Sequence, residues 1–422
     1  MTNESATLAI PFTFFVMKVA SRCNLNCNYC YMYNMGDLSY LRQPPVMPDA
    51  VVTASMQKIR QHGIRHGVTD VAFVLHGGEP MMAGRDFFRC FVSEAQRVLG
   101  PEIKPHFMMQ TNGTLIDRAW LDLFSELQIS FGISLDGPEH INDASRVNHA
   151  KRGSYRAVRA AIDLVLADPR CMKLFGTILT VVNLASDPLE LFRHFKEIGV
   201  GGVDFLLPDA TYERLPPGVS RDGDETPYAD WLISIFNEWF DASDTAFRIR
   251  FFENIIALIF GSAVSTDNIG GRHNSVVVIE TDGGIEPVDV LKICGEDFTK
   301  LGMNVLTNDI DDVYGAELVR KYQLGAAALC PTCRECAIRD VCGGGYLPHR
   351  YSSGSGFGNP SVYCRDLAKL ITHVQARVLK TLPEQMIERY SLSPLNYRDV
   401  WSAAADGWRA AFPARDRPIA IA

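Results

Sequence analysis

Three cysteines near the start of the chain have the spacing of a metal-binding loop. Cys23, Cys27 and Cys30 (the triad) form a Cys-x3-Cys-x2-Cys run directly after the apolar stretch Phe14–Val19, which we expect to be a strand. Thiolates are the usual ligands of iron–sulfur clusters. Three of them leave one iron of a [4Fe–4S] cluster open, which suits a cluster that does chemistry on a bound molecule. A structural zinc site would use four ligands, and a redox Cys-x2-Cys would not need Cys23.

A second group of cysteines lies further along the chain. Its members, here named the four-cysteine set, are Cys333, Cys336, Cys342 and Cys364. Such a density of cysteines in a chain expected to stay reduced indicates a metal site. A zinc ribbon remains an alternative on spacing alone. Cys294 and Cys330 are further candidate metal ligands, whereas Cys90 and Cys171 are expected to be buried small apolar residues.

Glycine-rich and polar segments follow three further apolar runs. The segments are Gly77–Pro80, Gln110–Gly113 and Ser134–Gly137. Glycine permits a close backbone approach, and Glu79 offers a carboxylate to an ammonium group. Each segment alone would be an ordinary turn, and Arg146 alone a solvated charge. Their order along successive strand ends indicates one shared site.

Short apolar runs alternate with amphipathic stretches over the first half of the chain. The expected strands are Phe14–Val19, Val71–His76, Phe107–Gln110, Ile129–Leu135, Phe175–Val182 and Val203–Leu207. The expected helices between them are Asp49–His62, Asp86–Leu99, Arg118–Leu127, Tyr155–Ala167 and Pro188–Ile198. This alternation favours an α/β fold with a parallel sheet, in an open or closed barrel. Ligand chemistry then belongs at the carboxyl ends of the strands.

The pattern changes after the sixth expected strand. A loop at 216–227, rich in proline, glycine and aspartate, leads to helical segments at Trp231–Phe240 and Phe251–Phe260, and a short-stranded region begins at Ser275. We predict three domains, at 1–240, 241–365 and 366–422. The last is expected to be helical at first and less regular around Pro394 and Pro413.

The composition is that of an ordinary globular protein with a slight acidic excess. The 422 residues are 47% hydrophobic and carry a formal net charge of −8. Such a chain has no general attraction for nucleic acid or an anionic membrane, and no stretch approaches the roughly 20 apolar residues of a membrane helix. The apolar residues at 8–20 lack the basic start of a secretory signal. We therefore expect a cytoplasmic protein with reduced cysteines and no nucleic-acid or membrane partner.

The triad, with the aromatic Tyr29 before its last cysteine, resembles the radical S-adenosylmethionine (SAM) superfamily. The resemblance implies a partial (β/α)6 TIM-like barrel whose open-iron cluster binds and cleaves SAM. It implies that the Gly-Gly-Glu-Pro segment binds the methionine amino group, that Ser134 and Arg146 lie near the ribose and carboxylate, and that Leu207 flanks the adenine. The implied SAM contacts are Tyr29, Gly77, Gly78, Glu79, Asn112, Ser134, Arg146 and Leu207.

The four-cysteine set resembles the SPASM or twitch-like iron–sulfur domain of peptide-modifying radical enzymes. The resemblance implies that these cysteines ligate at least one auxiliary [4Fe–4S] cluster. Four thiolates would leave it no open iron, so the role that the resemblance implies is electron transfer. The chain departs from the pattern of a further auxiliary cluster. Sulfatase-maturing relatives have a Gly-x4-Cys-Asp segment, but here Val288 replaces the cysteine before Asp289, and Tyr346 occupies another ligand position. Cys294 and Cys330 are left for a reduced or relocated cluster.

Three segments resemble maturases that build three-residue cyclophanes on ribosomally synthesised peptides, the FxsB-type enzymes. They are Asp282–Lys292, Gly343–Tyr351 and Gly358–Cys364. The resemblance implies an oxidoreductase that joins an aromatic ring carbon of a precursor peptide to a Cβ. A 5′-deoxyadenosyl radical abstracts the Cβ hydrogen and the carbon radical adds to the ring. Asp289 then accepts a proton and the auxiliary cluster an electron. An ordinary turn hydrogen bond is an equal alternative for Asp289.

The same scaffold supports other oxidations of a peptide. The main alternative is formylglycine formation by an anaerobic sulfatase-maturing enzyme, followed by peptide epimerisation and thioether formation. The missing ligands at Val288 and Tyr346 count against sulfatase maturation. A scaffold or electron carrier without radical chemistry is disfavoured because the triad, Glu79, Ser134 and Arg146 are intact. The implied partners are a precursor peptide and a reducing protein such as flavodoxin or ferredoxin.

Overall fold

One ten-stranded sheet organises the described chain, which comprises residues 10–390 and 392–413 of this computed structural model. Its strand order is β10-β9-β8-β1-β2-β3-β4-β5-β6-β7. The strands are β1 Phe14–Ala20, β2 Asp70–Gly77, β3 Lys104–Thr111, β4 Ile129–Ser134, β5 Phe175–Val181, β6 Gly202–Leu206, β7 Arg248–Ile249, β8 Val276–Ile279, β9 Gly284–Glu286 and β10 Met303–Asn304. β1 to β6 are parallel neighbours in chain order. The predicted α/β class and parallel, barrel-like sheet are confirmed.

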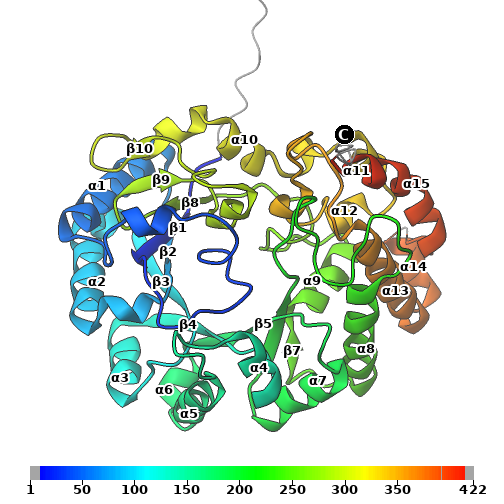
Figure 1. Ribbon diagram of the computed structural model, residues 1–422, viewed down its shortest axis with the longest axis horizontal. Coiled ribbons are helices and arrows are strands. Elements are labelled where there is room, and N and C mark those ends of the chain that lie inside the picture. The colour runs from blue at the N-terminus through cyan, green and yellow to red at the C-terminus, as the bar shows by residue number, and fades with distance from the viewer. Residues whose placement is uncertain (1–9, 391, 414–422) are drawn as a thin grey trace, which may run out of the picture.

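Helices cover the outer face of the parallel strands (Figure 1). They are α1 Asp49–His66, α2 Arg85–Leu99, α3 Arg118–Leu127, α4 Glu139–Ser145, α5 Tyr155–Leu166, α6 Pro169–Met172 and α7 Pro188–Glu197. Their apolar sides face the sheet, as in α2, where Phe88, Phe91 and Leu99 are buried. Cys90 is exposed because α2 turns it away from that side, so its predicted burial is wrong. Cys171 is buried as predicted.

The sheet continues into the second half of the chain. β7 pairs with β6, and β8 pairs with the other side of β1, both in parallel, while β9 and β10 add antiparallel strands. The remaining helices are α8 Pro227–Ala242, α9 Arg250–Ile259, α10 Glu317–Leu324, α11 Pro331–Arg334, α12 Arg339–Cys342, α13 Cys364–Thr381, α14 Glu384–Arg389 and α15 Tyr397–Ala410. The sheet thus crosses the boundary expected at residue 240, and the division into three domains stays a prediction.

Short 3-10 helices shape several of the loops. They are η1 Ser39–Arg42, η2 Pro80–Ala83, η3 Gly100–Glu102, η4 Asp289–Cys294, η5 Ile310–Gly315, η6 Gly325–Ala328 and η7 Leu347–Arg350. Three of these matter for the site because η2 follows β2, and η4 and η7 contact each other beside the carboxyl ends of the strands.

The C-terminal part is more regular than its prolines suggest. Residues 392–396, around Pro394, lie in no helix or strand, as predicted. α15 follows them, and its residues Val400, Ala404 and Trp408 recur every four positions and bury one side of the helix. Residues 391 and 414–422 of the predicted tail lie outside the described residues. Within the described ranges, no helix is long and apolar enough to cross a membrane.

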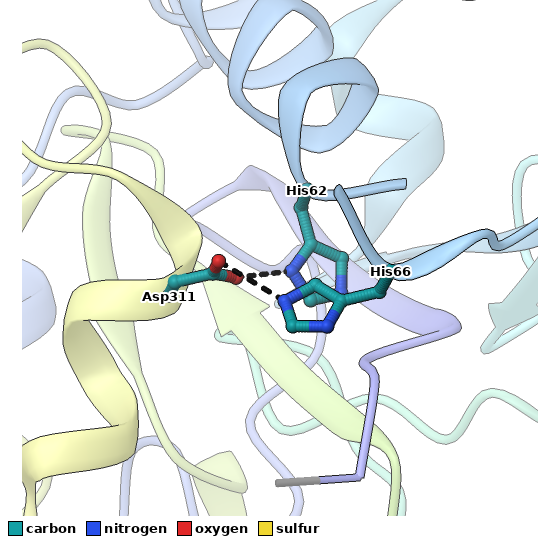
Figure 2. A group of neighbouring side chains, drawn as sticks. All are labelled: His62, His66 and Asp311. Atoms are coloured by element: carbon teal, nitrogen blue, oxygen red, sulfur yellow. Dashed lines mark hydrogen bonds and ion pairs between the residues drawn. The ribbon is translucent and has the colours of Figure 1, made fainter. Parts of the chain in front are cut away.

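A cluster of His62, His66 and Asp311 joins α1 to η5 (Figure 2). The backbone N–H of Phe12 donates to His62 Nε2 at 3.0 Å, so the ring hydrogen is assigned to Nδ1, which donates to Asp311 at 2.5 Å. The Arg65 guanidinium donates to the same carboxylate at 2.5 Å. The Arg65 guanidinium is already paired with the Asp311 carboxylate, and the His62 ring has no free lone pair. The cluster is therefore an ion-paired link between the two halves of the chain and not a metal site.

Candidate active site

A cavity of about 500 Å³ lies at the carboxyl ends of the parallel strands. The triad loop forms one side, and residues at the ends of β2 to β6 form the base. Asp289 and Val290 of η4, with Tyr346 and His349 at η7, close it from the second half of the chain. The structure therefore brings the strand-end segments singled out in the sequence to one cavity, where parallel sheets bind their ligands.

The triad loop is held in place by the two glycines at the end of β2. The Gly78 N–H donates to Ala20 O at 2.8 Å, and the Glu79 N–H donates to Arg22 O at 3.0 Å. Gly77 has φ +143°, and a Cβ there would lie 2.0 Å from Ala20 O. These glycines are thus required for packing against the backbone that leads into Cys23, in addition to any contact with a ligand.

The triad thiols suit a bound cation. Burial raises the pKa of the Cys23 thiol to about 12, with a contribution from the Glu79 carboxylate, and raises that of Cys30 to about 11. All three thiols line the cavity. Ligation requires thiolates, and the surrounding protein does not supply the positive charge that would stabilise them. A positively charged group such as an iron–sulfur core must supply it.

Seven of the eight residues expected to contact SAM line the same cavity. They are Tyr29, Gly77, Gly78, Asn112, Ser134, Arg146 and Leu207. The Arg146 guanidinium donates to the Tyr29 hydroxyl at 2.7 Å, and this hydroxyl donates to Asp136 at 2.5 Å. The Nε of Arg146 is buried without a hydrogen-bond partner among the described residues. An unpaired guanidinium N–H at this position fits the carboxylate of an amino-acid ligand.

Glu79 differs from the other expected contacts. It is fully buried and is not among the residues that line the cavity. Its carboxylate accepts hydrogen bonds from Thr111 Oγ1 and the Asn112 N–H at 2.8 Å, and from the Met81 N–H at 3.1 Å. Glu79 therefore joins the ends of β2 and β3 in this structure, and its contact with the SAM ammonium stays a prediction.

Comparison with known proteins agrees with this geometry. Residues 17–186, which include the triad and the ends of β1 to β5, match the family model described as the Radical SAM superfamily. Residues 17–186 form a radical SAM domain. The cofactors of this superfamily are a [4Fe–4S] cluster and SAM, and the triad and the buried Arg146 fit them.

Named relatives extend over most of the chain. The cysteine-type anaerobic sulfatase-maturating enzyme of Clostridium perfringens is 24% identical over 374 residues, which cover 87% of this chain and 98% of the relative. The serine-type enzyme of Bacteroides thetaiotaomicron is 24% identical over 400 residues, covering 87% and 91%.

Two solved structures resemble this fold. Native anSMEcpe with bound AdoMet and Cp18Cys peptide has a TM-score of 0.73 at 22% identity and covers 88% of this chain and 98% of its own. Streptococcus suis SuiB bound to precursor peptide SuiA has a TM-score of 0.50 at 15% identity and covers 81% and 73%. At these identities the likeness concerns the fold.

Opposite the triad of the radical SAM domain, Asp289 forms a buried ion pair. Its carboxylate contacts the Lys18 ammonium and accepts a hydrogen bond from the Tyr31 hydroxyl at 2.5 Å. His76 Nδ1 lies 3.0 Å from Lys18 Nζ. Burial alone would raise the pKa of Asp289, but the neighbouring Lys18 holds it well below its usual range. The carboxylate is ionised and firmly paired.

Four residues of this cavity region were not assigned a role from the sequence. They are Lys18, His76, Asp209 and His349. Lys18 and His76 lie in expected strands, and a local sequence pattern does not show which distant residues they contact. Asp209 follows the sixth strand, a position equivalent to those of the other strand-end segments, and that equivalence was the available signal.

The four-cysteine set lines a small pocket of its own beside the radical SAM domain. Val400 and Ala404 of α15 complete the pocket. Within the described residues, no three of the cysteine sulfurs lie within 4.8 Å of one another. A zinc ion with Zn–S bonds of about 2.3 Å would bring its sulfurs to about 3.8 Å. The thiols are thus not grouped as around a single bound zinc ion, and their ligation of a cluster stays a prediction.

The two extra cysteines lie in different surroundings. The Cys330 thiol is within hydrogen-bonding reach of Cys333, so it adjoins the four-cysteine set. Cys294 ends η4 and packs in a separate apolar group with Val290 and Leu291. The structure therefore places Cys330 beside the proposed cluster ligands, and it does not bring Cys294 to them.

Proposed function

We propose that this chain is a radical SAM enzyme that oxidises a side chain within a peptide by two electrons. The observation that carries the proposal is the single cavity that places the triad opposite a set of buried carboxylates and aromatic residues. The relatives are named as sulfatase-maturating enzymes, and two solved neighbours are named with peptides bound. A peptide substrate in this cavity accounts for both.

The residues that would hold the cofactors follow from the geometry. Cys23, Cys27 and Cys30 would ligate the cluster, and the seven cavity-lining contacts would surround SAM. When bound, these groups supply the one-electron chemistry that removes a hydrogen atom from a substrate carbon. Arg146 would receive the carboxylate of SAM at its unpaired Nε. The glycines after β2 would fix the loop that carries the thiolates.

The four-cysteine set would hold an auxiliary [4Fe–4S] cluster that takes up the second electron. Cys330 would be a fifth thiol beside it, and Cys294 would stay outside it. The first electron would come from a reducing protein such as flavodoxin or ferredoxin, in the cytoplasm, where thiols stay reduced. The cluster-bearing region would correspond to the domain proposed at 241–365, with residues 1–240 as the radical SAM barrel.

Asp289 is the proton acceptor that the sequence suggests. It faces the cavity, and its carboxylate is ionised, as a base requires. Its pairing with Lys18 and Tyr31 also fixes the position of its oxygens against the substrate side of the cavity. We propose that this pair orients the reacting side chain.

Two products of such an oxidation have specific support. Formylglycine is supported by the names of the relatives, which cover most of this chain. An aromatic-to-Cβ crosslink is supported by Val288 and Tyr346, because these residues replace cysteines of the sulfatase-maturing pattern, and Tyr346 lines the cavity. Both products need the same loss of a hydrogen atom, a proton and an electron.

Mass spectrometry distinguishes these products. The enzyme, purified without oxygen, is mixed with SAM, a reductant and either a cysteine-containing sulfatase peptide or a precursor peptide with an aromatic-x-x motif. A crosslink removes two hydrogens, whereas formylglycine formation from cysteine also replaces sulfur by oxygen. The matched control is Cys27→Ala, which should give no 5′-deoxyadenosine. No SAM-dependent change in either peptide would contradict the proposal.

A further inference from the structure

Asp209 and His349 form a second titratable pair in the cavity wall, apart from Lys18 and Asp289. Asp209 lies just beyond β6, and His349 belongs to η7, so the two halves of the chain contribute one residue each. The distance between His349 Nε2 and the nearer Asp209 carboxylate oxygen is 4.0 Å. Both residues line the same cavity as the triad.

His349 is held rigidly and has a free ring nitrogen. Its ring packs against Tyr346 at 5.3 Å and against Tyr363 at 4.9 Å between centroids. The residue is 3% exposed, and its Nε2 has no hydrogen-bond partner among the described residues. Burial lowers the pKa of His349 to about 3, so its imidazole is neutral near pH 7. A neutral ring can accept one proton and release another.

Asp209 differs from Asp289 in its freedom to take a proton. Within the described ranges, the basic side chain that lies within 4.0 Å of the Asp209 carboxylate is the neutral His349 alone, so no cation is paired with Asp209 there. Burial, and then the charge of Asp289, raises the pKa of Asp209 to about 7. Asp289 is paired with Lys18 and would lose that pairing on protonation. Of the two carboxylates, Asp209 has the greater proton affinity near pH 7.

We propose that Asp209, with His349 beside it, receives the proton that the substrate loses in the second half of the oxidation. This inference rests on the proposed peptide oxidation. In that reaction the substrate first gives up a hydrogen atom from carbon, and then loses one electron and one proton as its new bond forms. The electron goes to an oxidised iron–sulfur cluster, and the proton goes to an Asp209 carboxylate oxygen. Asp289 stays ionised and paired, as an orienting group.

Several titratable groups face this pair. Tyr346 and Tyr363 are buried beside His349, and both have pKa values well above their usual range because of burial. Asp289 faces Asp209 and carries Lys18 and Tyr31 on its other side. The tyrosines stay neutral and Lys18–Asp289 stays paired near pH 7. Asp267 lines the same cavity, and burial raises its pKa as well. The part of a pH dependence in this range that is lost in Asp209→Asn is therefore expected to report Asp209.

The test separates radical initiation from proton loss. The holoenzymes of Asp209→Asn, Asp289→Asn and wild type are given SAM, reductant and whichever of the two peptides wild type converts, deuterated at the reacting carbon. The surface control is Asp86→Asn, in the exposed first turn of α2. Asp209→Asn should still form deuterated 5′-deoxyadenosine, while product per 5′-deoxyadenosine falls about 100-fold. Asp209→Glu should restore part of the coupling.

The pH profile supplies a second measurement. For wild type, product per 5′-deoxyadenosine should rise with pH through about 7, because Asp209 accepts a proton only when ionised. His349→Gln should alter this limb without abolishing deuterium transfer. Wild-type coupling and pH profile in Asp209→Asn would overturn the inference, as would a loss confined to Asp289→Asn. A wild type that cleaves SAM but changes neither peptide would instead refute the proposed function.

Discussion

Lys18 shows how much a single residue can depend on distant parts of the chain. It is fully buried in β1, and its ammonium contacts Asp289, 271 positions later. A lysine inside an apolar run looks locally like an interruption, since burying an unpaired ammonium is strongly unfavourable. The ion pair with Asp289 removes that conflict. It also ties the first strand to η4, so that the cavity wall and the sheet share one electrostatic contact.

Removing the Lys18 charge should destabilise the protein strongly. Lys18→Met leaves the Asp289 carboxylate buried without its cation, and we expect the free energy of unfolding to fall by about 3–5 kcal/mol. The matched control is Lys321→Met, which breaks a largely exposed pair with Glu317 and should cost about 1 kcal/mol or less. Urea unfolding compares the two. Equal losses would contradict a buried ion pair at β1, and adding Asp289→Asn to Lys18→Met should restore stability.

Asp209 should make stability depend on pH in the opposite sense to most carboxylates. Its pKa is about 7 in the folded protein and about 3.9 when unfolded, so between these values the folded state binds the extra proton. Stability should therefore fall as pH rises from about 4 to 7. Relative to wild type, Asp209→Asn should gain up to about 4 kcal/mol at pH 8 and nothing at pH 4. The prediction is refuted if the difference in urea midpoint between wild type and Asp209→Asn stays the same from pH 4 to pH 8.

The sequence predicted the residues of the site better than their contacts. The triad, Ser134 and Arg146 could be recognised because residue type and strand-end position suffice to place them at one cavity. The hydrogen bond from Thr111 to the Glu79 carboxylate depends on the relative positions of the ends of β2 and β3. The pairing of Asp209 with His349 depends on the meeting of two halves of the chain. Such contacts leave no local pattern.

At the scale of elements, strands and helices with a strong apolar period were predictable nearly to their ends. α3 has the predicted bounds, Arg118–Leu127, and β1 to β6 differ from prediction by a few residues. The bounds of α15 within the predicted helical tail were not given, because two of its four buried residues are alanine, which adds little to an apolar pattern. Its importance comes from what it covers, since Ala404 lies against the four-cysteine set.

A charge on the inner side of α15 should affect the auxiliary cluster alone. Ala404→Asp places a carboxylate in the pocket of the four-cysteine set, where it repels thiolates and is poorly solvated. We expect the reconstituted protein to lose about four irons per chain while keeping the triad cluster. Ala403→Asp, on the exposed side of the same helix, should keep full iron content. Iron analysis and electron paramagnetic resonance check both. Equal iron content in Ala404→Asp and Ala403→Asp would contradict the placement of α15 against the four-cysteine set.

At the scale of the whole molecule, the sheet makes the two halves interdependent. β1 has β2 on one side and β8 on the other, and Val277 and Ile279 of β8 are fully buried. A chain that ends at residue 240 lacks β8 and would expose the edge of β1 that β8 covers, together with the apolar surface against which β8 packs. We expect it to aggregate or to be digested rapidly by protease, whereas the full chain resists. A stable, monomeric 1–240 fragment would instead support the domain boundary suggested by the sequence.

The place of β1 between β2 and β8 also bears on the order of synthesis. β1 and the triad loop leave the ribosome early, but β8 and Asp289 follow only after residue 275. During that interval the triad lacks the wall that η4 and η7 later form around the cavity. Iron and sulfide therefore have their widest access to Cys23, Cys27 and Cys30 on the growing chain. Completion of the sheet then closes the cavity wall beside these thiols.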